Sequence, residues 1–349
     1  MKPSRKANKI YESLRKDILR RRFAPGMLLP GEIEYAAELG VSRDTLRKAL
    51  DMLEAEHLVR RSRGHGTYVS EAIPKRKVTF LLPCPDTINT GTYYVANFLG
   101  GVQDACGKLM CELETLAISP TNDLNDIDWP QLFNLNKDSL VIVCSLWFLK
   151  IFPFLSAAGC KVVVIREQRK YYPEELAKFL TKPGWHDFLL DRQYEVDEML
   201  DHAFRQGCRR PGFVMSYLDD PENIMPELIR KKWAELVPDH VPPLVSIPEN
   251  LSAPAAGKVM KDLLKKHHCD CLFINTFNSL VAVRESFPEL YCGFFHRSSV
   301  RDFIGNGRSF YSWHDTVRIG YQAVQQLLRS DVSPERQVFR GRVSEYGTE

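Results

Sequence analysis

The stretch that decides the fold of the amino-terminal part reads GVSRDTLRKALDML and spans residues 40–53. Apolar residues recur in it at the spacing of one helix face, and these are Leu46, Ala49, Leu50 and Leu53. Ser42 stands directly before them, where its hydroxyl can accept a backbone N–H of the first helical turn. The stretch therefore predicts a capped helix with an apolar inner face, and its outer face presents Arg43, Thr45, Arg47 and Lys48.

Outward from this helix, two more helices are expected. Residues 8–22 place apolar side chains on one face, and these are Ile10, Leu14, Ile18 and Leu19. A short helix over residues 32–39 begins after Gly31, which is a tolerable N-cap, and ends at Gly40. Two helices joined by a tight Gly-Val-Ser turn are typical of the helix-turn-helix, whose second helix enters the major groove of DNA.

A hairpin is expected after the third helix. Residues 58–61 and 67–69 form short strands around Arg63-Gly64-His65-Gly66, and the glycines supply the positive backbone angles that a tight turn needs. Such a hairpin is a wing, and its basic tip is suited to the DNA backbone or the minor groove. The expected DNA contacts are therefore Ser42, Arg43, Thr45, Arg47, Lys48, Arg63, Gly64 and His65.

Charge is distributed unevenly along the chain. Residues 1–77 contain 18 Lys and Arg against 10 Asp and Glu, a formal charge of +8, whereas the remainder carries a formal charge of −5. A basic head on an acidic body indicates that the head meets a polyanion.

The head resembles the GntR-type winged helix. The likeness rests on Leu29-Pro30-Gly31-Glu32, on the run from Leu39 to Leu50 and on Gly64-His65-Gly66-Thr67-Tyr68-Val69. It implies DNA contacts at Arg43, Thr45 and Arg47 of the recognition helix and at Arg63 and Gly64 of the wing. Two positions depart from the pattern, because Gly31 replaces a Ser and His57 replaces the Gly that follows the helix.

The body, residues 78–349, alternates strand-like and helical runs. About nine strands are expected, in two series that cross at residues 187–193, and such alternation predicts parallel sheets covered by helices on both faces. The fold class is therefore α/β, with a winged helix-turn-helix over residues 1–71, a linker over 72–77 and a two-lobed, doubly wound domain over 78–349. Ligands of such sheets bind outside the carboxyl ends of the strands, here where the lobes face each other.

This body resembles the effector domain of the lactose-repressor family, which is related to periplasmic sugar-binding proteins. The likeness rests on residues 98–105, 158–163, 206–214 and 319–328. Together the two parts look like the arabinose-repressor branch of GntR regulators. The resemblance implies effector contacts at Tyr93, Tyr94, Asp191, Arg192, Arg230, Asn275, Phe277 and Phe295.

Each of these residues also has an ordinary structural interpretation. The aromatic residues can be packing residues, Asp191 can cap the following helix, and Arg230 can belong to a solvated helix face. Sugar-binding members usually have an Asn-Asp pair and an Asp near Thr276, Phe277 and Phe295. A non-sugar effector, or none, is therefore the alternative.

The chain lacks the motifs of other function classes. No Gly-rich phosphate loop, nucleophile elbow or His-carboxylate metal spacing occurs, so we expect no enzyme, no cofactor and no metal. The run His267-His268-Cys269-Asp270-Cys271 has no second cysteine pair to complete a metal site, and it is interpreted as a helix end entering a buried strand. The chain shows no long apolar run and no signal core, which favours a cytoplasmic protein without a membrane partner over a secreted solute-binding protein.

These features predict a transcriptional regulator that binds double-stranded operator DNA as a homodimer. The expected mechanism is repression of a carbohydrate-utilisation operon, released when a small molecule closes the cleft and changes the separation of the heads. An activator, or a regulator that responds only to protein contacts, stays open as an alternative.

Overall fold

The computed structural model describes residues 5–71, 76–83, 92–118, 123, 125, 127, 129–144, 146–168, 174–221, 223–295 and 308–345. The chain divides into two compact units. The first comprises Met1–Lys77 and Gly107–Glu112, and the second comprises Val78–Cys106 and Leu113–Glu349. Most of the expected linker, residues 72–75, lies outside the described residues, and the domain boundaries expected from the sequence stay a prediction.

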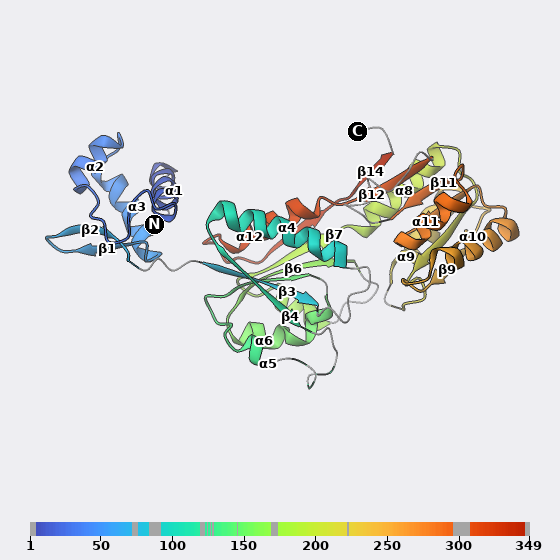
Figure 1. Ribbon diagram of the computed structural model, residues 1–349, viewed down its shortest axis with the longest axis horizontal. Helices are drawn as coiled ribbons and strands as arrows, with labels where there is room; N and C mark the ends of the chain where they lie inside the picture. Colours follow the sequence, from blue (N-terminus) through green and yellow to red (C-terminus); the bar gives the residue numbers. More distant parts are fainter. Residues whose placement is uncertain are drawn as a thin grey trace. The chain divides into compact units, whose positions relative to one another are not determined.

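The first unit contains the expected three helices and hairpin (Figure 1). Its elements are α1 (Arg5–Leu19), α2 (Glu32–Glu38), α3 (Arg43–Ala55), β1 (Val59–Ser62) and β2 (Gly66–Val69). The first helix begins and ends three residues earlier than expected, and beyond its end Arg21 has a φ of 57°. A residue in this left-handed region cannot continue a helix, which explains the early end.

The core of the first unit lies between α1 and α3. The apolar stripe expected on α3 is confirmed, because Leu46, Ala49, Leu50 and Leu53 are all buried. On α1 the expected face is confirmed at Leu14 and Ile18, and the other two buried residues of this helix are Ala7 and Tyr11. The expected residues Ile10 and Leu19 are only partly buried, and they pack against this core.

The second unit contains two lobes, and each has a six-stranded sheet. The first lobe has the strand order β13-β7-β6-β5-β3-β4. Its strands are β3 (Lys77–Pro83), β4 (Glu112–Ile118), β5 (Leu140–Cys144), β6 (Lys161–Glu167), β7 (Trp185–Leu190) and β13 (Glu335–Phe339). Its helical elements are α4 (Thr92–Leu109), α5 (Trp129–Leu132), the 3₁₀ helix η3 (Leu146–Ile151), α6 (Phe152–Ala157), α7 (Glu174–Leu180) and α12 (Thr316–Leu327). Helices α4 and α12 lie on one face of this sheet, and α5 and α6 lie on the other (Figure 1).

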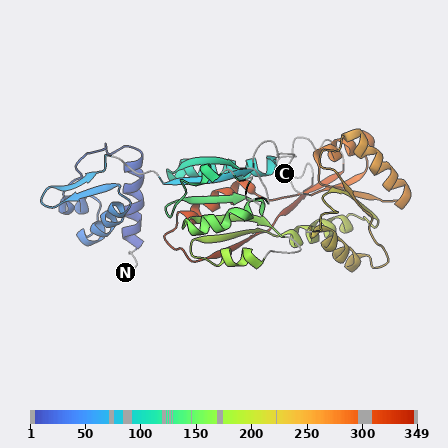
Figure 2. The same cartoon turned by 90° about the horizontal axis from the view of Figure 1, so that it is seen from below.

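The second lobe has the strand order β14-β12-β11-β10-β8-β9. Its strands are β8 (Pro211–Ser216), β9 (Leu244–Ile247), β10 (Cys271–Ile274), β11 (Tyr291–Phe294), β12 (Ser309–Trp313) and β14 (Arg342–Glu345). Its helices are α8 (Arg192–Arg205), α9 (Met225–Leu236), α10 (Ala253–His267) and α11 (Phe277–Ser286). Residues of α8 and α9 share one apolar core, and residues of α10 and α11 share another. Both sheets of the second unit are seen with their covering helices from a second side in Figure 2.

The topology confirms the parallel sheets but adds strands that the sequence did not reveal. Strands β12, β13 and β14 were missed, and β14 is antiparallel to β12. The chain crosses between the lobes three times, from β7 to α8 as expected and then from β12 to α12 and from β13 to β14. The missed strand β13 lies at a sheet edge, where every second residue is exposed. Such a short edge strand has no continuous apolar run to mark it.

The run His267-His268-Cys269-Asp270-Cys271 joins a helix to a strand. Helix α10 ends at His267 and β10 begins at Cys271, so the run between them is the expected helix end entering a buried strand. Among the described residues, no three His, Cys, Asp or Glu side chains are grouped so that they could hold a metal ion. In the same part of the chain, no helix combines the length and the apolar character needed to cross a lipid bilayer.

Helices α4 and α12 cross at two glycines. A Cβ atom built on Gly101 would lie 1.9 Å from the backbone oxygen of Val317, and one built on Gly320 would lie 2.2 Å from the backbone oxygen of Phe98. No side chain fits at such a separation, because the obstacle is backbone that cannot rotate away. The first lobe therefore depends on glycine at this crossing.

We expect Gly101→Ala to destabilise the second unit by roughly 3 kcal/mol, because the helices must separate to admit the methyl group. The matched control is Gly100→Ala, because a Cβ atom at Gly100 meets nothing within 4 Å. This neighbour should be neutral or stabilising by up to about 1 kcal/mol, through its higher helix propensity. Denaturant unfolding of both variants measures the difference, and equal stabilities would contradict the close crossing.

Candidate nucleic-acid interface

Helix α3 begins with the cap that the sequence predicts. The Ser42 hydroxyl oxygen accepts a hydrogen bond from the backbone N–H of Thr45 at 3.3 Å, and it lies 2.8 Å from the Thr45 hydroxyl oxygen. The cap fixes the first turn of the helix, and the buried stripe fixes its rotation about its own axis. Together they decide which side chains of α3 face solvent.

The solvent-facing side of α3 is basic. The side chains of Arg43 and Arg47 are 55% and 56% exposed, Lys48 is exposed, and Thr45 is half-buried. Arg43 and Arg47 are four residues apart and so lie about one helical turn from each other. The interpretation of α3 as a recognition helix required these two arginines to point outward, and they do.

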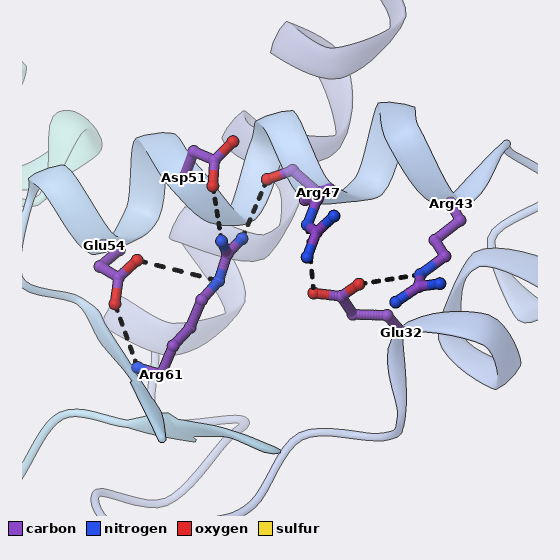
Figure 3. A network of polar contacts seen from close by, with 6 residues as sticks. All are labelled: Glu32, Arg43, Arg47, Asp51, Glu54 and Arg61. Carbon is purple, nitrogen blue, oxygen red and sulfur yellow. Dashed lines mark hydrogen bonds and ion pairs between the residues drawn. The ribbon is translucent and has the colours of Figure 1, made fainter. Parts of the chain in front are cut away.

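Glu32, the first residue of α2, lies between the two arginines (Figure 3). One of its carboxylate oxygens is 3.0 Å from Nε of Arg43, and the other is 3.9 Å from Nε of Arg47. Within the described ranges, neither guanidinium group has another hydrogen-bond or ion-pair partner. The terminal nitrogens therefore stay available, in an arrangement that suits the O6 and N7 acceptors of guanine.

The hairpin has the geometry of a wing. Strands β1 and β2 are antiparallel, with Val59 opposite Val69 and Ser62 opposite Gly66. Gly64 and Gly66 have φ values of 80° and 101°, which confirms that glycine is needed at both positions. The tip residues Arg63, Gly64 and His65 are all exposed.

Arg61 attaches the wing to the recognition helix (Figure 3). Its Nη1 is 2.5 Å from an Asp51 carboxylate oxygen, and its Nη2 donates to the backbone oxygen of Arg47 at 3.0 Å. The backbone N–H of Arg61 donates to the carboxylate of Glu54 at 3.1 Å. Arg61 therefore connects β1 to α3, and the wing and the recognition helix form one surface.

Sequence reasoning missed Glu32, Asp51, Glu54 and Arg61 as members of this surface. Asp51 and Glu54 follow Arg47 by four and seven residues, a spacing that places all three on the same side of a helix. This spacing was the one indication in the sequence that the acidic residues belong to the surface. The partner of each acidic residue comes from another element, so the pattern within α3 alone could not reveal it.

The effector residues expected at the crossing between the lobes are engaged with the protein itself. Asp191 caps α8 by accepting the backbone N–H of Tyr194 at 3.1 Å. Arg192 is buried, donates to Glu195 at 2.6 Å and forms an ion pair with Glu167. The Glu195 carboxylate also accepts a hydrogen bond from Ser312.

The other expected effector residues lie in different surroundings. The Asn275 side-chain oxygen accepts the backbone N–H of Ser216 at 2.8 Å, Phe277 is the half-buried first residue of α11, and Arg230 is exposed on α9. Phe295 is fully buried. Asn275 and Phe295 directly follow the neighbouring parallel strands β10 and β11, so the structure brings these two to the same sheet edge. The side chains of Tyr93 and Tyr94 lie outside the described residues.

Comparison with known proteins identifies the head. Residues 6–69 match the family described as "Bacterial regulatory proteins, gntR family". The chain is 45% identical over 62 residues to the HTH-type transcriptional repressor NagR of Bacillus subtilis (strain 168), which is 18% of this chain and 26% of that protein. It is 40% identical over 62 residues to the mannosyl-D-glycerate transport/metabolism system repressor MngR of Escherichia coli (strain K12), again 18% and 26%. The chain thus spans about a quarter of the length of these relatives.

Solved structures share the fold of the larger part. The Cra transcriptional dual regulator from Pseudomonas putida, in complex with fructose 1-phosphate, has a TM-score of 0.54 at 14% identity, covering 78% of this chain and 99% of that one. A LacI family transcriptional regulator from Enterococcus faecalis V583 with bound ribose has a TM-score of 0.56 at 12% identity, covering 77% and 98%.

We expect Glu32→Gln to lower the preference for specific over non-specific DNA. Without the carboxylate, the two arginines lose a contact of roughly 0.2–1 kcal/mol each, whereas general affinity for the polyanion rises slightly. The control is Glu34→Gln, which removes an exposed charge from the same helix and should change only the general affinity. Each variant is titrated with a duplex selected for tight binding and with a scrambled duplex, which gives the ratio of specific to non-specific affinity. The same ratio in Glu32→Gln and Glu34→Gln would contradict this role of Glu32.

These observations together identify residues 6–69 as a DNA-binding domain of the gntR family, joined to a two-lobed part with the fold of LacI-type regulators.

Proposed function

We propose that the protein is a dimeric transcriptional repressor that binds a palindromic operator and responds to a small molecule. The observation that carries the proposal is the outward pair Arg43 and Arg47 on a capped helix, fixed beside a glycine-tipped wing. Each recognition helix enters the major groove of one half-site, and each wing tip lies at the neighbouring minor groove.

The proposed contacts divide into two kinds. Arg43 and Arg47 read guanine edges, and Thr45 and Lys48 contact bases or phosphates beside them. Ser42 and the wing tip, with Arg63, Gly64 and His65, contact the sugar-phosphate backbone. The backbone contacts set the position on the duplex, and the arginines set the sequence.

The fold of the second unit supports a small-molecule effector at the carboxyl ends of the strands. In this proposal the effector binds near Asp191, Asn275 and Phe277, which follow the carboxyl ends of β7 and β10. Its binding shifts the lobes and thereby the separation of the two heads in the dimer. The relatives named above are repressors, and the neighbouring structures hold sugars or a sugar phosphate, which supports a carbohydrate-related effector and operon.

A specific observation favours a second candidate, in which the effector is not a sugar or is absent. Arg192 and Glu195 already neutralise each other in a buried pair, and Phe295 is fully enclosed. The protein then offers fewer polar side chains to hydrogen-bond sugar hydroxyls than the expected effector residues implied. The regulator would in that case respond to an apolar ligand or to a protein.

We expect Arg47→Ala to weaken specific operator binding by about 1–3 kcal/mol, roughly 5–150-fold, because a bidentate base contact is lost. The operator is obtained by selection from random duplexes with the unaltered protein, and affinities follow from fluorescence anisotropy between about 50 and 200 mM salt. The control is Lys16→Ala, which removes an exposed charge from α1 and should weaken specific and scrambled duplexes alike. Unchanged specific affinity in Arg47→Ala would refute the recognition helix.

We expect a small molecule to stabilise the second unit saturably, by about 2.7 kcal/mol at a hundredfold excess over its dissociation constant. Thermal unfolding is screened with sugars, sugar phosphates and aromatic metabolites, followed by release from the selected operator. Phe277→Ala should weaken the response, whereas Phe133→Ala, at a side chain 67% exposed in the first lobe, should not. Stabilisation by none of these compounds would favour the second candidate.

A further inference from the structure

Glu56, at the end of the recognition helix, collects polar side chains from two other segments of the first unit. It is the C-cap of α3, and its side chain is 14% exposed. One carboxylate oxygen accepts a hydrogen bond from Nε of Arg15 on α1 at 2.9 Å. The other accepts hydrogen bonds from the Tyr11 hydroxyl and from Nη2 of Arg76. One carboxylate thus holds two guanidinium groups and a phenol.

Arg15 extends these contacts to the end of helix α4. While its Nε donates to Glu56, its Nη1 donates to the backbone oxygen of Leu109, the last residue of α4, at 3.3 Å. A guanidinium group suits this double role because its N–H donors point in fixed directions within one plane. The next residue, Met110, has a φ of 59°, a left-handed conformation that residues with a side chain rarely adopt. Arg15 therefore holds the chain where it turns sharply.

The backbone of Arg76 contacts the same turn. Its carbonyl oxygen accepts the backbone N–H of Glu112, the first residue of β4, at 2.9 Å. The segment Gly107–Glu112, here called the α4–β4 connection, accordingly belongs to the same compact unit as the head, although α4 and β4 otherwise belong to the second unit. These hydrogen bonds all lie within the first unit. We call Glu56, Arg15 and Arg76 the clamp.

Two acidic residues near the end of α3 have different partners. Glu54 accepts the backbone N–H of Arg61 and thereby contacts the wing, whereas Glu56 contacts the two arginines of the clamp. The side chains of Glu56 and Arg15 are each only 14% exposed, and separating such a pair leaves both charges poorly solvated. A displacement of the α4–β4 connection therefore acts on α3 through the clamp.

We propose that the clamp couples the recognition helix to the α4–β4 connection, so that operator binding at α3 and the conformation of Gly107–Glu112 change together. Arg15 is the positioning residue, because it alone contacts both Glu56 and Leu109 through its side chain among the described contacts of the clamp. The inference rests on the operator binding proposed above and on no particular effector. Because coupling between two sites is reciprocal, a change at the connection alters operator affinity as operator binding alters the connection.

Arg15→Lys tests the clamp in the full chain. Lysine keeps the positive charge, but its ammonium group is a point charge without the two separated donors of arginine. The control is Arg20→Lys, the same exchange at an exposed residue just beyond α1. Without DNA, backbone hydrogen exchange of residues 107–112 should be several-fold faster in Arg15→Lys and unchanged in Arg20→Lys. Equal exchange in the two variants overturns the proposal.

The response to the operator is the second readout, and a merely structural role of Arg15 would not abolish it. Binding of the selected duplex should change the exchange of residues 107–112 in the unaltered protein and in Arg20→Lys. Arg15→Lys should bind the same duplex without this change. The proposal is overturned if the change survives in Arg15→Lys, or if the unaltered protein shows none.

Two further measurements separate the clamp from other failures. Exchange of the backbone amides of Leu50 and Leu53, in the core of the head, shows whether each variant stays folded. If these amides also exchange faster in Arg15→Lys, Arg76→Met takes its place, because it leaves α1 intact, and the same outcomes decide. If no duplex can be selected, the proposed function fails, whereas hydrogen exchange without DNA still decides whether the clamp holds the connection.

Discussion

The burial of one apolar stripe on α3 is the constraint on which the head depends. Leu46, Leu50 and Leu53 are fully or almost fully enclosed against the other helices, and no rotation of α3 keeps them there while turning Arg43 or Arg47 inward. The Ser42 cap fixes where the helix begins, and so it fixes which residues make up its first exposed turn. The exposed basic surface of α3 is therefore a consequence of hydrophobic packing on the opposite side of the same helix.

Acidic residues decide how the basic residues of this protein are used. In the head, Glu32 holds two arginines at the surface, and Asp51 and Glu54 turn Arg61 into an anchor for the wing. In the body, Asp187 neutralises Arg166 within the first lobe, and Arg336 contacts the same carboxylate. The net charge of the chain does not reveal these separate roles, because the role of each arginine depends on which carboxylate lies within reach.

The sequence predicted much of the local structure and little of the connectivity. Helices with strong apolar periodicity, such as α3, and fully buried strands, such as β5, carry their own signal. Strands β13 and β14 have no comparable signal, since each lies at a sheet edge and forms only because a neighbour supplies hydrogen-bond partners. The crossing of α4 and α12 at Gly101 and Gly320 also depends on two segments more than 200 residues apart. Neither segment by itself shows why glycine is needed there.

By itself, the sequence determined the winged helix, the outward direction of Arg43 and Arg47, and the glycine-built wing. These features depend on residues close together in the chain, where helix periodicity, capping and positive φ angles act directly. Only the tertiary structure decided that Glu32 and Arg61 organise that surface, that Asp191 and Arg192 are engaged at the crossing between the lobes, and that Glu56 holds Arg15 and Arg76. The physical reason is that electrostatic and packing energies depend on distance in space, and folding sets those distances between residues that the sequence keeps far apart.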